Sequence, residues 1–502
     1  MTNHNVYEHF RRAFQDGGTF IRSAIGDDLY SYGDLDELSG RYASLFRSLG
    51  LNPGDRVIVQ IDKCPEALMI YFGCLRAGLV YLPLNTAYRE HELEYFIEDA
   101  EPSLIVCAPE SEDFFMDNSE AEVRTLDSQG KGSVTVGLAA SDSAFEPTEC
   151  AADDTAVILY TSGTTGRPKG AMITHGNLLS NATTLHRAWG WCADDVMLHA
   201  LPIFHIHGLF VATHLPVLNA SPIIFLDHFD PATVIELLPE ATVYMGVPTN
   251  YTRLLTNPNL NRDICRNMRL FTSGSAPLLA QTFHEFHERT GHTIVERYGM
   301  TETGMNTSNP LGGPRKPGTV GPPLEGVDIR IVDDENTEVK TGEPGNLLVK
   351  GDNVFKGYWR MPGKTNEEFT ADGFFKTGDM ASIDDDGYVS IVGRSKDMII
   401  SGGLNVYPKE VEIVINEIAG VKESAVIGIP DEDFGELVTA IVVPEDSGQV
   451  TEKAIISYLK NNLANFKVAK RVHFVEELPR NTMGKVQKNL LRENFSPPES
   501  EE

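Results

Sequence analysis

The sequence predicts an α/β fold: a large N-terminal domain of doubly wound α/β subdomains with a β-barrel-like part, followed by a small α+β C-terminal domain. The first observation is length, because 502 residues exceed what one hydrophobic core normally holds. The second is an alternation of strand-like and helix-like segments before residue 300. The third is a Pro- and Gly-rich stretch at residues 309–326, which cannot hold a helix and marks a change to strand-like segments.

The first part of the alternation is typical of a doubly wound unit. The expected elements are a strand at 54–61, a helix at 65–78, a strand at 79–84, a helix at 89–100 and a strand at 103–108. The first helix is marked at both ends, because Pro65 suits a helix start and Gly78 suits a helix end. Residues 110–127 are acidic and lack periodicity, so we expect part of them to be a solvated loop.

A second alternation follows and predicts a paired subdomain. Its expected elements are a helix at 175–189, a strand at 221–229, a helix at 231–240, and mixed segments at 242–255, 268–278 and 293–304. Beyond the Pro- and Gly-rich stretch, residues 327–333, 345–351 and 386–393 read as antiparallel strands. The last part combines strands at 423–429 and 439–445 with a helix at 452–463.

The expected division is an N-terminal domain at 1–393, a hinge at 394–396 and a mobile C-terminal domain at 397–502. A short turn between two strands lets one domain swing against the other with little refolding of the backbone.

Composition excludes several classes of partner. Asp plus Glu number 72 against 42 Lys plus Arg, so the net charge of −30 argues against nucleic acid or an anionic membrane surface. The six cysteines are dispersed and include no C-x-x-C pair, which indicates reduced, mostly buried thiols in a cytoplasmic protein. No stretch approaches the ~18 apolar residues of a membrane span, and the first residues lack the apolar core of a signal peptide.

The stretch YTSGTTGRPKG at residues 160–170 has the composition of a phosphate-binding loop. Glycines allow backbone N–H groups to turn toward an anion, hydroxyls donate further hydrogen bonds, and Arg167 and Lys169 offset the phosphate charge. It is not a Walker loop, because Gly166 is separated from Lys169 and an extended segment follows. The alternative for such a run taken alone is a glycine-rich surface turn.

Five motifs in order resemble those of the adenylate-forming superfamily, which includes acyl-CoA synthetases. They are TSGTTGRPKG, YGMTE at 298–302, TGD at 377–379, GRSKDMIISGGLNVYP at 393–408 and PRNTMGKVQK at 479–488. Within that superfamily, LPLNTAY, HALPIFHIHGLF, GVPTNYTRLL and NVFKGYWRMPGKT are most similar to the malonyl-CoA synthetase group. The resemblance implies a ligase that joins malonate, with methylmalonate second, to coenzyme A through an acyl-adenylate, releasing AMP and pyrophosphate. It also implies ATP, Mg²⁺ and coenzyme A as cofactor and co-substrates.

The resemblance assigns roles to the nucleotide site. Glu302 matches the magnesium ligand, Thr301 the contact to the α-phosphate, and Asp379 the acid that binds the ribose hydroxyls. The implied ATP-binding residues are Thr161, Ser162, Gly163, Thr164, Thr165, Gly166, Lys169, Ser273, Gly274, Ser275, Ala276, Pro277, Glu296, Arg297, Tyr298, Gly299, Asp379 and Arg394. The implied catalytic residues are Lys485, Thr301, Glu302 and His207.

The C-terminal motifs imply domain alternation. Lys485 resembles the lysine that spans the α-phosphate and the attacking carboxylate in the first step, and rotation of the domain then brings another loop to the thioester site. Lys396 occupies the hinge position. The residues implied for coenzyme A are Lys396, Ser401, Gly402 and Gly403. Acetylation of Lys485 by a lysine acetyltransferase is a further hypothesis, because it would remove the charge that the first step needs.

The acyl pocket is predicted from two arginines. Arg253 and Arg297 fall in segments that line this pocket in the family, and a buried guanidinium there makes sense if the acid brings a second carboxylate. The acyl-site residues are His207, Arg253, Ser275, Arg297 and Met305. The alternatives are that Arg253 points to solvent and that Arg297 pairs with Glu296. The rival functions are a short- or medium-chain monocarboxylate acyl-CoA synthetase and a stand-alone adenylation domain that loads a carrier protein.

Overall fold

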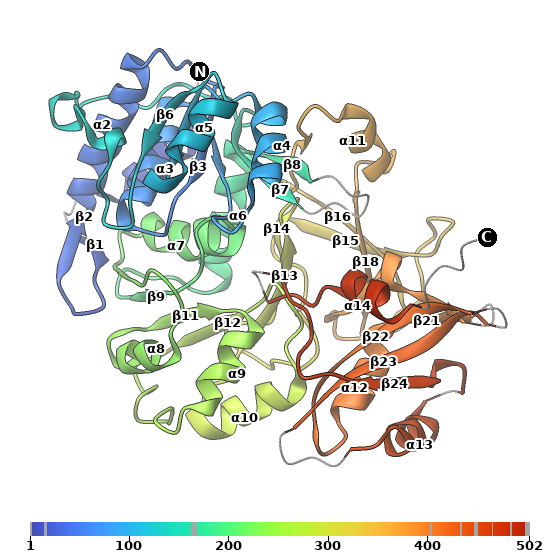
Figure 1. Cartoon of the computed structure of the whole chain (residues 1–502). Helices are drawn as coiled ribbons and strands as arrows, with labels where there is room; N and C mark the ends of the chain where they lie inside the picture. Colours follow the sequence, from blue (N-terminus) through green and yellow to red (C-terminus); the bar gives the residue numbers. More distant parts are fainter. Residues whose placement is uncertain are drawn as a thin grey trace.

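The computed structural model describes residues 3–14, 18–161, 168–401, 404–431, 434–445, 450–463, 465–481 and 484–496. The two-domain α/β architecture predicted from the sequence is confirmed (Figure 1). The first sheet of the N-terminal domain has seven strands in the order β17-β8-β7-β4-β3-β5-β6. Its strands are β3 (Arg56–Gln60), β4 (Val80–Pro83), β5 (Leu104–Cys107), β6 (Glu122–Thr125), β7 (Thr155–Thr161), β8 (Lys169–Thr174) and β17 (Gly357–Tyr358).

The helices of this first unit follow the predicted alternation. They are α1 (Val6–Arg11), α2 (Tyr32–Ser48), α3 (Pro65–Ala77), α4 (Glu90–Ala100), α5 (Glu112–Asn118) and α6 (His175–Ala188). Helix α3 begins at Pro65 and ends before Gly78, whose φ of 69° is left-handed, as the sequence predicted. Only residues 119–121 and the ends of the stretch 110–127 match the expected loop, because α5 and β6 occupy the rest. Each is short and buries a single side chain deeply, Phe115 and Thr125, so no period shows in the sequence.

The second sheet has eight strands in the order β14-β13-β12-β11-β9-β10-β1-β2. They are β1 (Thr19–Arg22), β2 (Asp28–Ser31), β9 (Met197–His199), β10 (Ile223–Phe225), β11 (Val243–Gly246), β12 (Leu270–Ser273), β13 (Val295–Met300) and β14 (Gly304–Ser308). Its helices are α7 (Ala212–Leu218), α8 (Pro231–Leu237), α9 (Pro248–Thr256) and α10 (Ala280–Thr290). Strand β1 pairs in parallel with β10, so the beginning of the chain is built into the second subdomain.

A third, antiparallel sheet holds β15 (Val327–Val332), β16 (Gly345–Gly351), β18 (Phe375–Ile383) and β19 (Val389–Arg394). Strand β18 was missing from the predicted strands, although it carries the TGD motif. Helix α11 (Pro362–Glu368) precedes it. A 3-10 turn, Ser395–Asp397, connects β19 to the C-terminal domain, at the position of the expected hinge.

The C-terminal domain has a hydrophobic core of its own, which includes Ile399, Val411, Val438 and Leu459. Its strands are β20 (Ile399–Ser401), β21 (Leu404–Val406), β22 (Val421–Asp431), β23 (Gly435–Pro444) and β24 (Arg471–Phe474). Its helices are α12 (Pro408–Asn416), α13 (Glu452–Asn462) and α14 (Lys488–Phe495). In Figure 1 this domain, in orange and red, lies beside the second subdomain.

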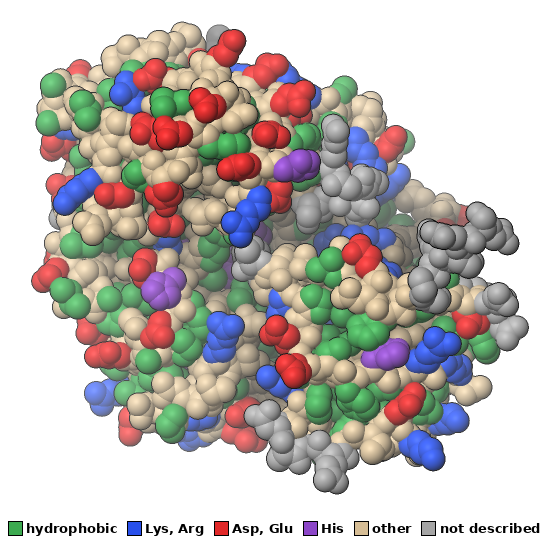
Figure 2. All heavy atoms as spheres, viewed as in Figure 1, with side chains coloured by type: hydrophobic (Ala, Val, Ile, Leu, Met, Phe, Trp, Pro, Cys, Tyr) green, Lys and Arg blue, Asp and Glu red, His purple; other side chains and the backbone are tan. Residues whose placement is uncertain are grey.

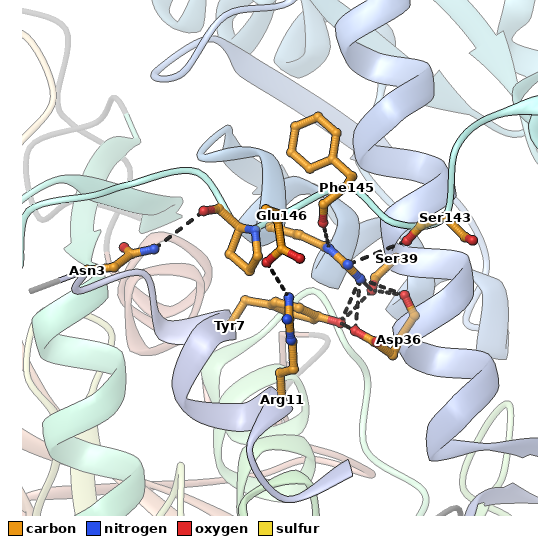
Figure 3. Close-up of polar contacts among 10 residues, drawn as sticks. Asn3, Tyr7, Arg11, Asp36, Ser39, Ser143, Phe145 and Glu146 are labelled. Carbon is orange, nitrogen blue, oxygen red and sulfur yellow. Dashed lines mark hydrogen bonds and ion pairs between the residues drawn. The ribbon is translucent and has the colours of Figure 1, made fainter. Parts of the chain in front are cut away.

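The segment that leads into the phosphate loop is anchored by Arg76 of α3, whose partners Asp36, Ser143 and Phe145 are labelled in Figure 3. This arginine is 2% exposed, forms an ion pair of 2.9 Å with Asp36, and donates to the carbonyl oxygens of Phe145 and Ser143. The hydroxyl of Tyr7 lies between the guanidinium and Asp36. A buried cation with this many partners fixes residues 143–145 against α2 and α3.

Other expectations concern the surface and the cysteines. Five of the six cysteines are buried, Cys192 is exposed, and all are free, as predicted. Within the described ranges no helix is long and apolar enough to cross a membrane. Figure 2 shows carboxylates spread over the N-terminal domain in this view. Such a face repels polyanions.

Candidate active site

Residues from three predicted motifs meet at Asp379. This aspartate lies on β18 and is 4% exposed. Its Oδ1 accepts an ion-pair contact of 2.7 Å from Nε of Arg394, and its Oδ2 accepts a hydrogen bond of 2.5 Å from the hydroxyl of Tyr298. The antiparallel register of β18 and β19 places Asp379 opposite Arg394. The carboxylate is therefore fixed in orientation, and its remaining lone pairs suit donation from ribose hydroxyls.

The predicted adenine wall is a tight loop at the end of β12. Ser275 has φ of 70°, a left-handed conformation that is uncommon outside glycine and is enriched at functional sites. The loop is held by Glu296, whose Oε1 accepts a hydrogen bond of 2.9 Å from the backbone N–H of Leu278. Burial raises the pKa of Glu296 to about 7. The remaining predicted wall residues, Ala276 and Pro277, follow Ser275 directly on the same loop.

Arg297 is a buried cation without an acidic partner. It is 2% exposed, and its Nε and Nη2 atoms have no hydrogen-bond partner. Among the described residues it forms no ion pair, so the alternative pairing with Glu296 is not seen. Its guanidinium lies against Gly274, where an added Cβ would stand 2.4 Å from the arginine Cζ. Burial lowers the pKa of Arg297 to about 9, so the guanidinium remains charged at neutral pH.

His207 lies next to this cation at the start of a π-helical turn, His207–Val211. Its side chain is fully buried, and neither ring nitrogen has a partner. Burial lowers the pKa of His207, and the positive charge of Arg297 lowers it further. Its backbone N–H donates to Nδ1 of His205 at 3.3 Å, and burial lowers the pKa of His205 to about 4. These buried residues thus combine one uncompensated positive charge with two neutral imidazoles, a combination that suits an anionic ligand. π-turns are often found at functional sites.

Arg253 is not buried with Arg297. It is exposed in the last turn of α9, which matches the alternative that it points to solvent. The reason is helical period, because Tyr251, Leu254 and Leu255 face the core and leave Arg253 on the other side. Arg253 nevertheless borders a cavity of about 460 Å³.

The cavity lies between the two domains. Its lining includes Lys63, Asp227, Thr249 and Arg253 from the N-terminal domain, and Arg480, Asn481 and Gly484 from the C-terminal domain.

Lys63 is a site residue that sequence reasoning missed. Its ammonium donates to the carbonyl oxygen of His199 at 2.9 Å and lies 4.3 Å from the ring centre of Phe225. Burial lowers its pKa. The available signal was its position just after a buried strand, β3, because ligands in open α/β sheets bind at the carboxyl ends of strands.

The phosphate end of the site is built around Glu302. This carboxylate is 6% exposed and accepts hydrogen bonds from the hydroxyls of Tyr358 at 3.0 Å and Thr161 at 3.4 Å. Lys169, 8% exposed, lies 4.2 Å from the ring centre of Tyr358 and 3.9 Å from Glu368. The loop residues Ser162, Gly163, Thr164, Thr165 and Gly166 lie outside the described part of the chain.

Glu302 fits the magnesium role that the resemblance implies. Burial raises its pKa, so a divalent cation would stabilise the ionised carboxylate. The described residues contain no group of three or more His, Cys, Asp or Glu side chains that could hold a metal. Mg²⁺ characteristically uses one or two carboxylates together with substrate phosphates, which matches a single buried glutamate beside a phosphate loop. Gly299 and Thr301 precede Glu302 on the same chain segment.

Lys485 reaches the nucleotide site from the C-terminal domain. Although more than a third of its surface is exposed, loss of hydration lowers its pKa to about 8, and the charge of Arg394 contributes. Asp379 and Asp397 act in the opposite direction. The preceding residue, Gly484, packs beside Thr249 of α9. The described conformation therefore brings the predicted catalytic lysine close enough to Asp379, the predicted ribose-binding acid, for their charges to interact.

The remaining predicted residues are more dispersed. Met305 is fully buried in β14. Lys396 is exposed in the 3-10 turn, and Ser401 is buried in β20, where it pairs with Leu404 and Gly435 of the same domain. Gly402 and Gly403 lie outside the described residues. Ser401 thus belongs to the C-terminal domain's own sheet in this conformation.

Comparison with known proteins identifies the family. Residues 11–359 match the AMP-binding enzyme family, and residues 410–485 match the AMP-binding enzyme C-terminal domain. A malonate–CoA ligase from Arabidopsis thaliana is 35% identical over 98% of this chain and 89% of its own length. ATP-bound MatB from Rhodopseudomonas palustris is 52% identical, covers 98% of this chain and 99% of its own, and superposes with a TM-score of 0.96.

The structure of apo MatB from the same organism, also 52% identical and covering 98% and 99%, gives a TM-score of 0.87. The arrangement described here is therefore closer to the ATP-bound structure than to the apo structure. The resemblance inferred from the five motifs is confirmed, and the chain belongs to the AMP-binding enzyme family.

Proposed function

We propose that this protein is an AMP-forming acyl-CoA synthetase that converts malonate, ATP and coenzyme A to malonyl-CoA, AMP and pyrophosphate. The observation that carries the choice of acid is the buried guanidinium of Arg297, which has two unpartnered nitrogens and lies close to His207. A monocarboxylate would leave this charge uncompensated once its reacting carboxylate faces ATP. A dicarboxylate supplies the missing partner.

In the first step, an oxygen of one malonate carboxylate attacks the α-phosphorus of ATP. The bond from the α-phosphorus to the bridging oxygen breaks, and pyrophosphate leaves. Lys169 and Lys485 bring positive charge to a site where two anions meet, and Thr301 directly precedes Glu302 at the phosphate end. Asp379 and Tyr298 fix the nucleoside, which holds the α-phosphorus in place.

In the second step, the sulfur of coenzyme A attacks the acyl carbon of malonyl-adenylate. The thiol loses its proton, the bond between the acyl carbon and the phosphate oxygen breaks, and AMP leaves. Lys485 does not take part in this step. Rotation of the C-terminal domain at residues 394–396 can therefore move Lys485 away from the reacting atoms and bring the loop after β20 to the acyl group. The short 3-10 turn Ser395–Asp397 between two strands suits such a rotation.

Arg297 and Arg253 contribute to the selection of the acid in different ways. The buried Arg297 binds the carboxylate that does not react, and the ring N–H of His207 donates a hydrogen bond to the same acid. Arg253, exposed at the cavity border, attracts the dianion before it enters. Ser275, which has a left-handed conformation, and the fully buried Met305 are the other residues assigned to the acyl group.

Three finer features belong to the same proposal. Mg²⁺, held by Glu302 and the ATP phosphates, would neutralise charge on the leaving pyrophosphate. The protein would act in the cytoplasm, in keeping with its reduced, mostly buried cysteines.

Acetylation of Lys485 would stop the first step, because it removes the positive charge of the lysine side chain. Full activity after stoichiometric acetylation at that position would refute this regulatory role.

Malonate-dependent exchange of pyrophosphate into ATP tests the proposal. Exchange is measured with malonate, methylmalonate, acetate, succinate and octanoate at equal concentrations. Malonate should give the fastest exchange, with methylmalonate second. Faster exchange with acetate or octanoate would overturn the diacid assignment, and transfer to a carrier protein but not to coenzyme A would overturn the choice of thiol.

A further inference from the structure

The loop that carries Lys485 is tied to the sheet of its own domain by Arg480. One guanidinium nitrogen of Arg480, Nη1, donates a hydrogen bond of 2.6 Å to the carbonyl oxygen of Gly484, the residue directly before Lys485. The other, Nη2, makes an ion pair with the carboxylate of Glu423. A single planar group therefore connects strand β22 to the peptide that precedes the catalytic lysine.

Further hydrogen bonds join the described residues on the two sides of this loop, among them one of 2.9 Å from the N–H of Gly484 to the carbonyl oxygen of Asn481. The N–H of Asn481 donates to the carbonyl oxygen of Lys485 at 2.9 Å, and the N–H of Lys485 donates to Oδ1 of Asn481 at 2.9 Å. Arg480 and Val486 form an isolated antiparallel bridge beyond them. Gly484 has φ of 73°, a left-handed conformation that suits glycine. These contacts connect the described residues 480–481 and 484–486 to one another, and the ion pair to Glu423 fixes where Arg480 sits on the domain.

The ion pair is partly shielded from water, because the Arg480 and Glu423 side chains are 29% and 23% exposed. Both residues belong to the C-terminal domain, so the pair moves together with Lys485 when the domain rotates. Its influence on the reaction is therefore confined to the step that uses Lys485.

We propose that Glu423 and Arg480 are positioning residues for Lys485 in adenylate formation. The inference rests on the two-step reaction proposed above. Arg480 holds the carbonyl oxygen of Gly484, and Glu423 holds Arg480, so the lysine ammonium is presented at a fixed height above Asp379. Without the pair, the loop keeps its turn but shifts on the domain, and misplacement of about 1 Å is enough to cost on the order of 100-fold in rate.

Arg480 also borders the interdomain cavity, so it could instead touch a substrate directly. Glu423 is not part of the cavity lining and separates the two roles. Glu423→Gln removes the anchor and leaves the arginine charge at the cavity. Arg480→Gln removes both.

The experiment measures the two half-reactions separately in the full-length enzyme. Variants Glu423→Gln, Arg480→Gln, Arg480→Lys and the double variant are compared in malonate-dependent pyrophosphate exchange and in transfer of preformed malonyl-adenylate to coenzyme A. The matched control is Glu410→Gln, which breaks another ion pair of this domain, that of Lys467 with Glu410 at 2.8 Å. Circular dichroism and the unfolding midpoint establish that each variant is folded.

Both Gln variants should lower exchange by 10- to 100-fold and change the transfer step by no more than about twofold. The exchange rate of the double variant should be no lower than that of the slower single variant, because both substitutions remove the same ion pair. Arg480→Lys should be intermediate, since a lysine can pair with Glu423 but cannot also clamp Gly484. The Glu410→Gln control should behave as wild type in both assays.

Three outcomes would overturn the inference. They are an unaffected Glu423→Gln with a damaged Arg480→Gln, equal loss in both half-reactions, and loss in the Glu410→Gln control of the same size. The first would assign Arg480 to a substrate contact. Failure of the proposed function is distinct, because it would appear in the wild-type enzyme as absence of malonate-dependent exchange.

Discussion

The hydroxyl of Tyr298 donates a hydrogen bond of 2.5 Å to Oδ2 of Asp379, across 81 residues of sequence. This contact joins β13 of the second sheet to β18 of the third, and so connects the predicted adenine wall to the predicted ribose-binding acid. Arg394 holds the other carboxylate oxygen at 2.7 Å. The predicted nucleoside site is thus held together by contacts within the protein, and its parts can be tested one at a time.

Removing the tyrosine hydroxyl tests this preassembly. Tyr298→Phe should raise the KM for ATP by roughly fivefold, the equivalent of about 1 kcal/mol for one lost hydrogen bond, without changing the KM for malonate. Steady-state kinetics with each substrate varied in turn measure both constants. The control is Tyr388→Phe, which removes a hydroxyl that donates to the carbonyl oxygen of Pro314 at 2.7 Å. Equal increases in both KM values would place Tyr298 outside the nucleotide site.

Lys485→Ala should separate the half-reactions. Its ammonium lies close enough to Asp379 and Arg394 for their charges to affect its pKa, so its loss should block adenylate formation. Transfer from preformed malonyl-adenylate to coenzyme A should remain near the wild-type rate. Lys453→Ala, at an exposed lysine of α13, provides the control. Comparable loss of both steps would mean that Lys485 is structural or that the domains do not alternate.

The rate of the first step should depend on pH through Lys485. Its pKa, lowered to about 8 by loss of hydration and by Arg394, means that the ammonium is charged below pH 8 and loses its proton above it. The value of kcat/KM for ATP in the exchange reaction should therefore fall above about pH 8, because this ratio reports the free enzyme. Lys485→Arg should abolish the decline within the stable pH range. A decline that persists in this variant would belong to another group.

Arg297 and Arg253 should differ in their effect on malonate. Arg297→Met should lower kcat/KM for malonate. The loss of transition-state stabilisation should be about 2–4 kcal/mol, because the second carboxylate would lose its buried partner. Acetate, which lacks that carboxylate, should lose little. Arg253→Met should reduce the same stabilisation for malonate by only about 1 kcal/mol or less, since Arg253 is exposed and its attraction for the acid is screened by water. The ratio of malonate to acetate activity in each variant measures the effect, and an unchanged ratio in Arg297→Met would remove this arginine from the acid site.

The Arg76 network should matter for stability and not for catalysis. Arg76→Met removes a 2% exposed guanidinium that binds Asp36 and two backbone carbonyls, so the free energy of unfolding should fall by about 2–4 kcal/mol. The exposed pair of Arg11 with Glu146, also visible in Figure 3, provides the control. Arg11→Met should cost at most about 1 kcal/mol in urea unfolding. A larger effect of Arg11→Met than of Arg76→Met would contradict the burial argument.

The sequence predicted elements well where chemistry marks their ends. Helix α3 is bounded by Pro65 and Gly78, and the phosphate loop by two strands. The sequence failed at residues 112–125, where a helix and an edge strand are too short to show a period. The π-turn at His207 was also invisible, because it lies in an uninterrupted buried run that fits several structures equally well.

The direction of side chains was harder to predict than the motifs. Residues such as Asp379 and Lys485 could be assigned because each sits in a motif that resembles the family. Arg253 and Arg297 were indistinguishable in sequence, yet one is exposed on a helix and the other is buried against Gly274. Lys63 belongs to none of the motifs. Only the folded structure shows that it lines the cavity, where its ammonium donates a hydrogen bond to the carbonyl oxygen of His199.

The central claim is that the uncompensated charge of Arg297 selects an acid with two carboxylates. A crystal structure of the protein soaked with malonate, ATP and Mg²⁺ tests it most directly. The claim predicts electron density for malonate or malonyl-adenylate, with the free carboxylate within hydrogen-bonding distance of Nε or Nη2 of Arg297. Density that places this carboxylate away from Arg297, with the guanidinium still unpartnered, would contradict it.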